Sequence, residues 1–383
     1  MEGERRDEGR GEPPREGMRR RRALQRLAAA SLVWAGGFES LRGAAGRAPD
    51  DEPLPPLPRM PLLEYRDGTG LAHPVRRRSE WERRRRAIRA AFAEVAGPLP
   101  GREKRCPLRV QVLSEDDCGD FVRQDITYQS EPDGRVPAYL LIPKTALAGK
   151  RAAGALCLHQ THAAGRKVVV GLGQSPDDEY GVELVRRGYV CLAPAYPLLA
   201  DYAPDVTGLG YKSGTMKAVW DNVRGLDLLD SLPFVRGGRF AAIGHSLGGH
   251  NAIYTAVWDR RLKVVVTSCA FDAYLHYMRG NLSGWIQTRY LPGFENYRGR
   301  PGEVPFDFHE LIASLTPRAF FANAPKGDGN FRWRSVAMIE AAVRPVYDLW
   351  KAGPRLQFRH PEGGHRFPPE VRQEAYAFIE REL

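Results

Sequence analysis

A serine lies between glycines near the middle of the chain, in the motif GHSLG at residues 244–248. The apolar residues 240–244 are typical of a buried strand, and the following residues, LGGHNAIYTAVW, are typical of a helix. Glycines at such a junction let a strand and a helix pass close together, because they carry no Cβ atom. The turn then presents the serine hydroxyl to a ligand. The pattern predicts that Ser246 is a nucleophile; the alternative is a serine that only caps the helix.

A serine nucleophile needs a base to take its proton, and a histidine base needs a carboxylate to orient it. Asp328 follows the predicted strand 319–323 in the loop APKGDGNF, and His365 follows the predicted strand 356–360 in the loop PEGGHRF. Both loops come after Ser246 in the chain, so we expect an acid at Asp328 and a base at His365. Asp272, which follows the predicted strand 263–268, is the alternative acid.

The negative oxygen of a tetrahedral intermediate needs two N–H donors. One is expected to be the N–H of Leu247, directly after the nucleophile. The other is expected from Gln160 or Thr161, in the loop after the predicted strand 155–159, and His159 is expected to brace that loop. The histidines considered less suitable as the base are His245, His250, His276, His309 and His360.

Residues 272–308 are rich in aromatic side chains and are broken by glycine and proline. This segment is expected to form a cap-like insertion after the sixth core strand. Trp285 and Tyr290 are predicted to contact substrate there, and His245 is predicted to line the floor of the pocket. Packing of the cap on the body of the protein explains the two aromatic residues equally well.

Strand-like and helix-like segments alternate from about residue 108 onward, which predicts an α/β fold. We expect a mostly parallel central sheet with helices on both faces, and an antiparallel edge formed by the early, closely spaced strands. The predicted strands are 108–113, 122–128, 136–142, 155–159, 189–193, 240–244, 263–268, 319–323 and 356–360.

Several motifs together resemble the α/β-hydrolase superfamily, nearest to its dienelactone-hydrolase-like and acetyl-xylan-esterase-like bacterial branch. The motifs read LHQTHAAG, YGVELVRRGYVCLAPAYP, GHSLGGH, PFDF, PRAFFANAPKGDGNF and GGHRF, and the resemblance covers roughly residues 75–383. The resemblance implies the α/β-hydrolase fold. The chain departs from the family at Gln160, where the oxyanion loop usually has glycine, and at Ala195, where an acid is common. Its nucleophile is serine rather than the cysteine of true dienelactone hydrolases, which favours ester substrates.

These observations predict a serine hydrolase that cleaves carboxylic esters through an acyl-enzyme intermediate, with a carbohydrate ester or a small ester as substrate. One alternative is an aminopeptidase or acylpeptide hydrolase of the same fold. A second is a lyase or C–C bond hydrolase of this fold, and a third is a binding protein without catalytic activity. No cofactor is expected, because no dinucleotide or phosphate-binding motif follows a strand, and no metal site is expected.

The net charge of +11 comes largely from arginine blocks near the N-terminus. No nucleic-acid-binding motif accompanies them, so no nucleic-acid partner is expected. Residues 79–96 are predicted to form a helical lead-in, capped by Ser79 and Glu82, with its arginines on a solvated face. Five cysteines form no CxxC pair, and Cys106 and Cys118 can pair if the protein is exported.

Residues 1–60 are expected to be a disordered leader that ends in a proline-rich linker, ahead of a hydrolase domain at 61–383. The segment MRRRRALQRLAAASLVWAGGF resembles a twin-arginine export signal. The alternative is a disordered basic tail in a cytoplasmic protein. No apolar run reaches the roughly 20 residues of a transmembrane helix, so no membrane span is expected.

Overall fold

The computed structural model describes residues 53–383. Residues 1–52 of the predicted leader at 1–60, which include its export-signal-like segment, lie outside the described residues. The described end of the predicted linker packs on the domain through hydrogen bonds. Arg59 Nε donates to Glu310 Oε2 at 2.8 Å, and His276 Nε2 donates to the carbonyl oxygen of Pro55 at 2.7 Å.

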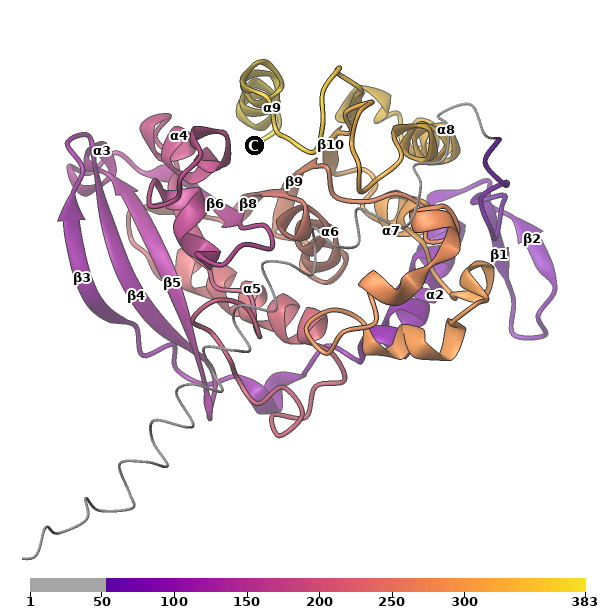
Figure 1. The fold of residues 1–383 in the computed structure, drawn as a ribbon, viewed down its shortest axis with the longest axis horizontal. Helices are drawn as coiled ribbons and strands as arrows, with labels where there is room; N and C mark the ends of the chain where they lie inside the picture. The colour runs from indigo at the N-terminus through magenta and orange to yellow at the C-terminus, as the bar shows by residue number, and fades with distance from the viewer. Residues whose placement is uncertain (1–52) are drawn as a thin grey trace, which may run out of the picture. The chain divides into compact units, whose positions relative to one another are not determined.

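A nine-stranded sheet lies at the centre, in the order β11-β10-β9-β8-β6-β7-β5-β4-β3 (Figure 1). The strands from β11 to β7 pair in parallel, whereas β5, β4 and β3 pair antiparallel at one end. This arrangement confirms the predicted sheet and its antiparallel edge. The strands are β3 (Gln111–Asp117), β4 (Phe121–Glu131), β5 (Gly134–Pro143), β6 (Ala152–Leu158), β7 (Val190–Pro194), β8 (Val235–His245), β9 (Leu262–Ser268), β10 (Ala319–Asn323) and β11 (Leu356–Arg359), with a separate hairpin of β1 (Glu64–Arg66) and β2 (Ala72–Pro74).

Alternate residues of the central strands point to opposite faces of the sheet. In β8, Phe240 and Ala242 pack into the core on one face, while Ala241 and Ile243 pack into the core on the other. A strand that is buried on both faces has a continuous apolar sequence, which explains why β6, β8, β9 and β10 were predictable.

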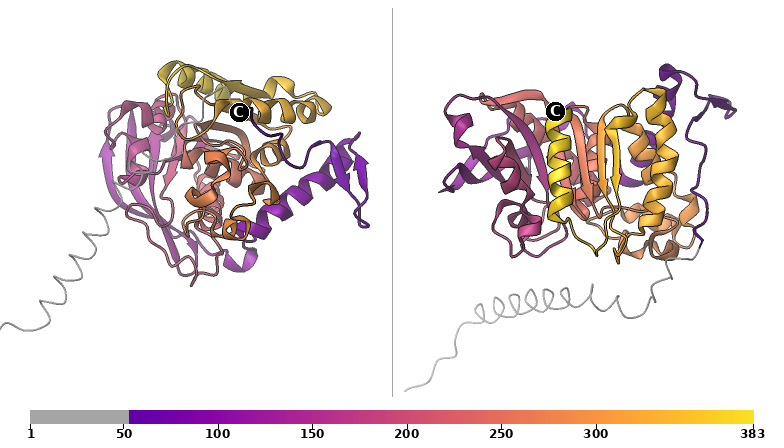
Figure 2. Two further views of the ribbon diagram at one scale, coloured as in Figure 1. Left: turned by 45° about the vertical axis from the view of Figure 1, so that its right-hand side comes forward. Right: turned by 90° about the horizontal axis from the view of Figure 1, so that it is seen from above.

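Helices cover both faces of the sheet, as predicted. Helices α2, α5, α6, α7 and α8 contribute to the first core, and α4 and α9 contribute to the second. The right-hand view of Figure 2 shows α9, in yellow, beside the strands that it covers. The helices are α2 (Arg78–Ala96), α3 (Lys144–Leu147), α4 (Tyr180–Arg186), α5 (Gly214–Ser231), α6 (Leu247–Trp258), α7 (Phe308–Ser314), α8 (Trp333–Leu349) and α9 (Pro369–Glu382).

The predicted lead-in helix is α2, which buries Trp81, Ile88, Phe92 and Val95 as its spacing indicated. The predicted cap was wrong. The N-cap is Arg77, and the carboxylate of Glu80 accepts hydrogen bonds from the N–H groups of Arg76 and Arg77 at 2.8 and 2.9 Å. An acid two residues earlier than expected therefore starts the helix.

The insertion after β9 is a chain of short 3-10 turns that leads into α7. These turns are η5 (Tyr277–Gly280), η6 (Leu282–Gly284), η7 (Pro292–Tyr297) and η8 (Pro301–Glu303). The other 3-10 turns are η2 (Arg102–Lys104), η3 (Gly165–Val170), η4 (Pro176–Asp178) and η9 (Gly353–Arg355).

All five cysteines lie in the described part of the chain and are free thiols, so Cys106 and Cys118 are not paired. Among residues 53–383, no helix combines the length and the apolar character needed to cross a membrane.

Candidate active site

Ser246 forms a one-residue turn between β8 and α6. Its backbone has φ 52° and ψ −120°, in the left-handed half of the φ range, where a side chain other than glycine is strained. Such strain costs about 1–3 kcal/mol and persists only where the surroundings enforce it. The N–H of Ser246 donates to the carbonyl oxygen of Ser268 at 2.8 Å, which anchors the turn to the end of β9.

The glycines around this turn allow a very close approach of the backbone. A Cβ atom at Gly248 would lie 1.8 Å from the carbonyl oxygen of Leu158, at the end of β6. A Cβ atom at Gly244 would lie 2.2 Å from the carbonyl carbon of Gly248. The motif therefore has the strand, turn and helix geometry that the sequence predicted.

Asp328 and His365 are hydrogen-bonded to each other. His365 Nδ1 donates to Asp328 Oδ1 at 2.9 Å and lies 3.1 Å from Oδ2. The Asp328 side chain is only 1 % exposed, whereas that of His365 is 24 % exposed. With its proton on Nδ1, the imidazole keeps a lone pair on Nε2, which suits a general base.

Burial alone would raise the pKa of Asp328. The hydrogen bond and the positive charge of His365, with the N–H groups of Asn330 and Phe331, outweigh burial and hold the pKa of this carboxyl below its usual range. The N–H of Asn330 donates to Oδ1 at 2.8 Å. Asp328 is therefore a carboxylate at neutral pH.

The imidazole of His365 lies beside the serine turn. Its ring centroid is 4.8 Å from that of His245, the residue directly before Ser246, and 6.1 Å from that of Phe331. The structure thus brings the loops after β8, β10 and β11 together at one edge of the sheet. These loops carry Ser246, Asp328 and His365.

A buried network that the sequence did not predict holds the His365 loop. Asn323 Nδ2 donates to the carbonyl oxygen of Arg366 at 3.0 Å and to Ser268 Oγ at 2.9 Å. His245 Nδ1 lies 3.1 Å from the same Ser268 Oγ. The one feature of the sequence that could have indicated this network is that Ser268 and Asn323 are polar residues at the ends of buried strands, β9 and β10.

Cys269 also contacts this network. Its thiol lies 3.3 Å from the carbonyl oxygen of Arg366, and its Sγ, with ligand atoms of Asp328 and His365, forms a group within 4.8 Å. Burial and the charge of Asp328 raise the pKa of the Cys269 thiol well above its usual value. A protonated thiol donates its hydrogen bond to the carbonyl oxygen of Arg366, whereas a metal ligand would need to be a thiolate.

The predicted oxyanion loop is held by His159. The N–H of Tyr196 donates to His159 Nε2 at 3.1 Å, so Nδ1 carries the proton and donates to the carbonyl oxygen of Gln160 at 2.8 Å. Burial lowers the pKa of His159 to about 4, which keeps the ring neutral. These bonds fix the peptide between Gln160 and Thr161, whose N–H points away from the held carbonyl.

Tyr290 of the insertion reaches the same loop. Its hydroxyl lies 2.9 Å from Thr161 Oγ1, and its ring packs in a small cluster with Leu247 and Tyr196. Tyr290 therefore connects both predicted oxyanion donors to the insertion.

Replacing Tyr290 with phenylalanine removes the hydroxyl while keeping the ring. We expect kcat for an aryl acetate to fall about fivefold with little change in KM, because the loop that carries an oxyanion donor loses a restraint. Steady-state kinetics of the purified variant measure this. Tyr297→Phe is the matched control, since its hydroxyl bonds to Glu94 Oε1 at 3.3 Å on the surface. Equal kcat values for Tyr290→Phe and the wild type would contradict this role.

Trp285 and His245 are almost completely buried by neighbouring side chains. Trp285 is 5 % exposed, and its ring centroid lies 4.9 Å from that of His250 and 5.5 Å from that of Tyr274. His245 is 5 % exposed, and burial and the nearby His365 lower its pKa to about 3. Packing accounts for both rings, and substrate contact by Trp285, Tyr290 or His245 stays a prediction.

The alternative acid, Asp272, has no hydrogen bond to His365. Its Oδ2 accepts the N–H of Arg332 at 3.1 Å, and its Oδ1 is buried without a hydrogen-bond partner among the described residues. Burial raises the pKa of Asp272 well above its usual value, which keeps it protonated.

Four of the histidines that were weighed as alternative bases bond to main-chain oxygens, which explains their positions without a catalytic role. The bonds are His250 Nδ1 to Ala270 O at 3.1 Å, His276 Nε2 to Pro55 O at 2.7 Å, His309 Nε2 to Pro58 O at 3.0 Å and His360 Nδ1 to Ala324 O at 3.0 Å.

Comparison with solved structures decides the fold. A glucuronoyl esterase from Solibacter usitatus superposes with a TM-score of 0.68 at 19 % identity, covering 88 % of this chain and 100 % of that one. A carbohydrate esterase family 15 glucuronoyl esterase from Caldicellulosiruptor kristjansonii superposes with a TM-score of 0.64 at 18 % identity, covering 87 % of this chain and 91 % of that one. The chain has the α/β-hydrolase fold.

In this fold, Ser246 follows β8, Asp328 lies after β10 and His365 lies after β11. In sequence, the chain is 24 % identical over 315 residues to the Bacillus subtilis (strain 168) protein named "Putative hydrolase YtaP", covering 79 % of this chain and 99 % of that protein. No protein-family model matches the chain.

Proposed function

We propose that the protein is a serine hydrolase that cleaves carboxylic esters of carbohydrates through an acyl-enzyme intermediate. The observation that supports this most strongly is the Asp328–His365 hydrogen bond beside the strained turn of Ser246. In this arrangement the imidazole can take the proton of the serine hydroxyl, and the carboxylate orients the imidazole and stabilises its positive charge.

In the first stage, Ser246 Oγ attacks the ester carbonyl carbon while Nε2 of His365 takes the hydroxyl proton. The carbonyl oxygen becomes negative, and the N–H of Leu247 and an N–H from Gln160 or Thr161 stabilise it. The C–O bond to the alcohol then breaks, and His365 returns the proton to the departing oxygen. An acyl group remains on Ser246.

In the second stage, His365 takes a proton from water as the water oxygen attacks the acyl carbon. The acid leaves, and Ser246 recovers its proton from His365. Asp328 stays ionised throughout, because its pKa lies below the usual range. Its charge stabilises the imidazolium that forms in each stage.

Carbohydrate esters are proposed as the substrate class because both solved structures described above are named as glucuronoyl esterases, one of them within a carbohydrate esterase family. Two kinds of ester fit this class: an acetylated sugar, and an alkyl ester of a sugar acid. The reaction described above is the same for both. In an acetylated sugar the carbonyl group belongs to the acetyl group, whereas in an alkyl ester of a sugar acid it belongs to the sugar.

A substrate panel tests the proposal. It contains an aryl acetate, an acetylated xylose, the methyl ester of glucuronic acid and a peptide anilide with a matched acyl group. We expect turnover of at least one sugar ester with kcat/KM at least about tenfold above the peptide anilide. Faster cleavage of the anilide would instead support an aminopeptidase or acylpeptide hydrolase.

A fluorophosphonate probe addresses the alternative of a binding protein without activity. Such a probe labels an activated serine, so we expect stoichiometric labelling at Ser246 in the folded protein. Ser246→Ala is the control and should show no label. A folded wild-type protein that takes up no label would favour the binding protein.

A further inference from the structure

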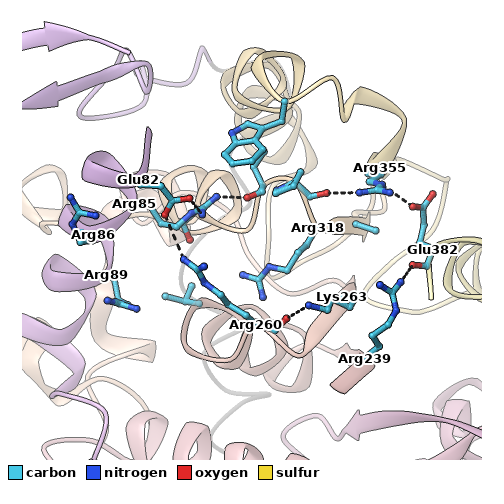
Figure 3. A pocket seen from close by; sticks show the side chains of 16 residues that line it. Glu82, Arg85, Arg86, Arg89, Arg239, Arg260, Lys263, Arg318, Arg355 and Glu382 are labelled. Carbon is cyan, nitrogen blue, oxygen red and sulfur yellow. Dashed lines mark hydrogen bonds and ion pairs between the residues drawn. The ribbon is translucent and has the colours of Figure 1, made fainter. Parts of the chain in front are cut away.

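A cavity lies at the amino ends of β8 to β11 and has a volume of about 520 Å³ (Figure 3). Basic side chains from the lead-in helix, the strand starts and the C-terminal elements point toward it. Its charged lining consists of Glu82, Arg85, Arg86, Arg89, Arg239, Arg260, Lys263, Arg318, Arg355 and Glu382.

This cavity is separate from the candidate active site. Ser246, Asp328 and His365 follow the carboxyl ends of parallel strands, whereas Arg318 and Lys263 lie at the amino ends of β10 and β9. A strand of five to seven residues, such as these two, spans about 20 Å. A ligand in this cavity therefore does not touch the reacting atoms.

Positive charge exceeds negative charge in the lining, since eight basic side chains face two carboxylates. Glu82 forms ion pairs with Arg85 and, at 3.5 Å, with Arg260. Glu382 pairs with Arg355 at 3.1 Å. These two acids leave most of the positive charge without an opposite charge in the lining.

Several of the cations are held by main-chain oxygens. Arg318 donates to the carbonyl oxygens of Asp259 and Leu262 at 3.0 and 3.1 Å, and Lys263 donates to that of Arg260 at 2.8 Å. A carbonyl group satisfies an N–H donor but carries no net charge. The guanidinium and ammonium groups are therefore fixed in place while their charge is not neutralised.

Like charges contribute to the pKa shifts of these groups. Burial, together with the charges of Arg85 and Arg260, lowers the pKa of Arg318 to about 10. Burial also lowers the pKa of Lys263, with contributions from Arg318 and Arg239. An anion in the cavity would reduce this repulsion.

Helix α2 presents one regular stripe to the cavity, formed by Glu82, Arg85, Arg86 and Arg89. Glu82 lies three and four residues before Arg85 and Arg86, and Arg89 lies four and three residues after them, so all four lie on one face of the helix. The prediction of a solvated arginine face was therefore incomplete, because this face borders a cavity. Arg86 is exposed and forms no ion pair with any residue in the described part of the chain.

We propose that this cavity is a binding site for an oligophosphate or a phosphate ester, either free or as part of a larger molecule. Guanidinium groups match phosphate oxygens with paired N–H donors, and seven of the eight cations are arginines. A single phosphate is much smaller than a cavity of about 520 Å³, so the ligand carries several phosphate groups or an organic part. The site does not depend on the proposed ester hydrolysis.

Isothermal titration calorimetry of the full chain with sodium triphosphate tests the proposal. At about 50 mM salt, where exposed charges are only partly screened, we expect saturable binding of one triphosphate per chain. Arg86→Glu should weaken this binding at least about tenfold, because it places a negative charge on the cavity face of α2. Ester turnover by Arg86→Glu should equal that of the wild type, since the two sites lie at opposite edges of the sheet.

Arg102→Glu is the matched control, because Arg102 is exposed, lies outside the cavity and changes the net charge by the same amount. It should bind triphosphate like the wild type. Equal weakening by both variants would overturn the proposal in favour of non-specific attraction to a basic protein. Unsaturable or undetectable binding of triphosphate would also overturn it, unless the lipid arm below shows binding that depends on Arg86.

The lipid arm of the test measures binding of the protein to phosphatidylcholine vesicles with and without phosphatidic acid. Binding that needs phosphatidic acid and is lost in Arg86→Glu but kept in Arg102→Glu would identify the phosphate source as a lipid headgroup. Triphosphate binding without vesicle binding would identify a free phosphate compound. Absence of both overturns the site.

Discussion

Ser246→Ala is expected to lower kcat for ester hydrolysis by a factor of about 10⁴ or more. The substitution removes the atom that forms the acyl-enzyme, so Asp328 and His365 have no nucleophile to activate. Only the oxyanion donors and binding then accelerate direct attack by water. Steady-state assays with an aryl acetate, at enzyme concentrations high enough to detect slow turnover, measure the ratio.

The fold should survive this change. Alanine and serine differ by one exposed oxygen, and both carry the Cβ atom that is already accommodated at φ 52°. We expect the melting temperature to change by less than about 3 °C. Ser283→Ala, at an exposed site in the insertion, is the control and should keep wild-type kcat. Near-normal turnover by Ser246→Ala would contradict the proposed mechanism.

Asp328→Asn is expected to lower kcat by about 10³–10⁴. The amide can offer an N–H to Nδ1 of His365, which favours the tautomer with the proton on Nε2, where it cannot accept the serine proton. It also removes the negative charge that stabilises the imidazolium. The loss should appear in kcat far more than in KM, because it acts on the transition state.

Asp272→Asn provides the comparison for Asp328→Asn. Burial keeps Asp272 protonated, so an amide of the same shape preserves its neutral charge and can still accept the N–H of Arg332. We expect kcat to fall by less than about tenfold. If Asp272→Asn is instead the more damaging change, Asp272 is the catalytic acid and the loop after β9 supplies it.

The sequence predicted the buried strands well and the exposed edge strand poorly. The sequence predicts β10 at its observed bounds, Ala319–Asn323, because all of its residues are buried and the first four are apolar. The first predicted strand, 108–113, is observed as β3 at Gln111–Asp117. All seven residues of β3 are exposed, so the strand has no apolar pattern to mark its ends.

The positions of the site residues were predictable because their order along the chain follows the order of parallel strands. Their supporting contacts were not. Asn323 and the carbonyl of Arg366 are 43 residues apart, and nothing local in either segment indicates the hydrogen bond between them. Likewise, the spacing in α2 indicates which arginines share a face, but not that the starts of β9 and β10 lie opposite that face.

The tight packing around Gly244 and Gly248 also bears on how such a protein can change over evolutionary time. Since even one methyl group would collide with the neighbouring backbone, the nucleophile's immediate surroundings tolerate almost no variation. New specificity must therefore arise in segments that meet the serine from outside, such as residues 272–308 and the loop after β6. The turn of Ser246 can in this way stay unchanged while the segments around it acquire new substrate contacts.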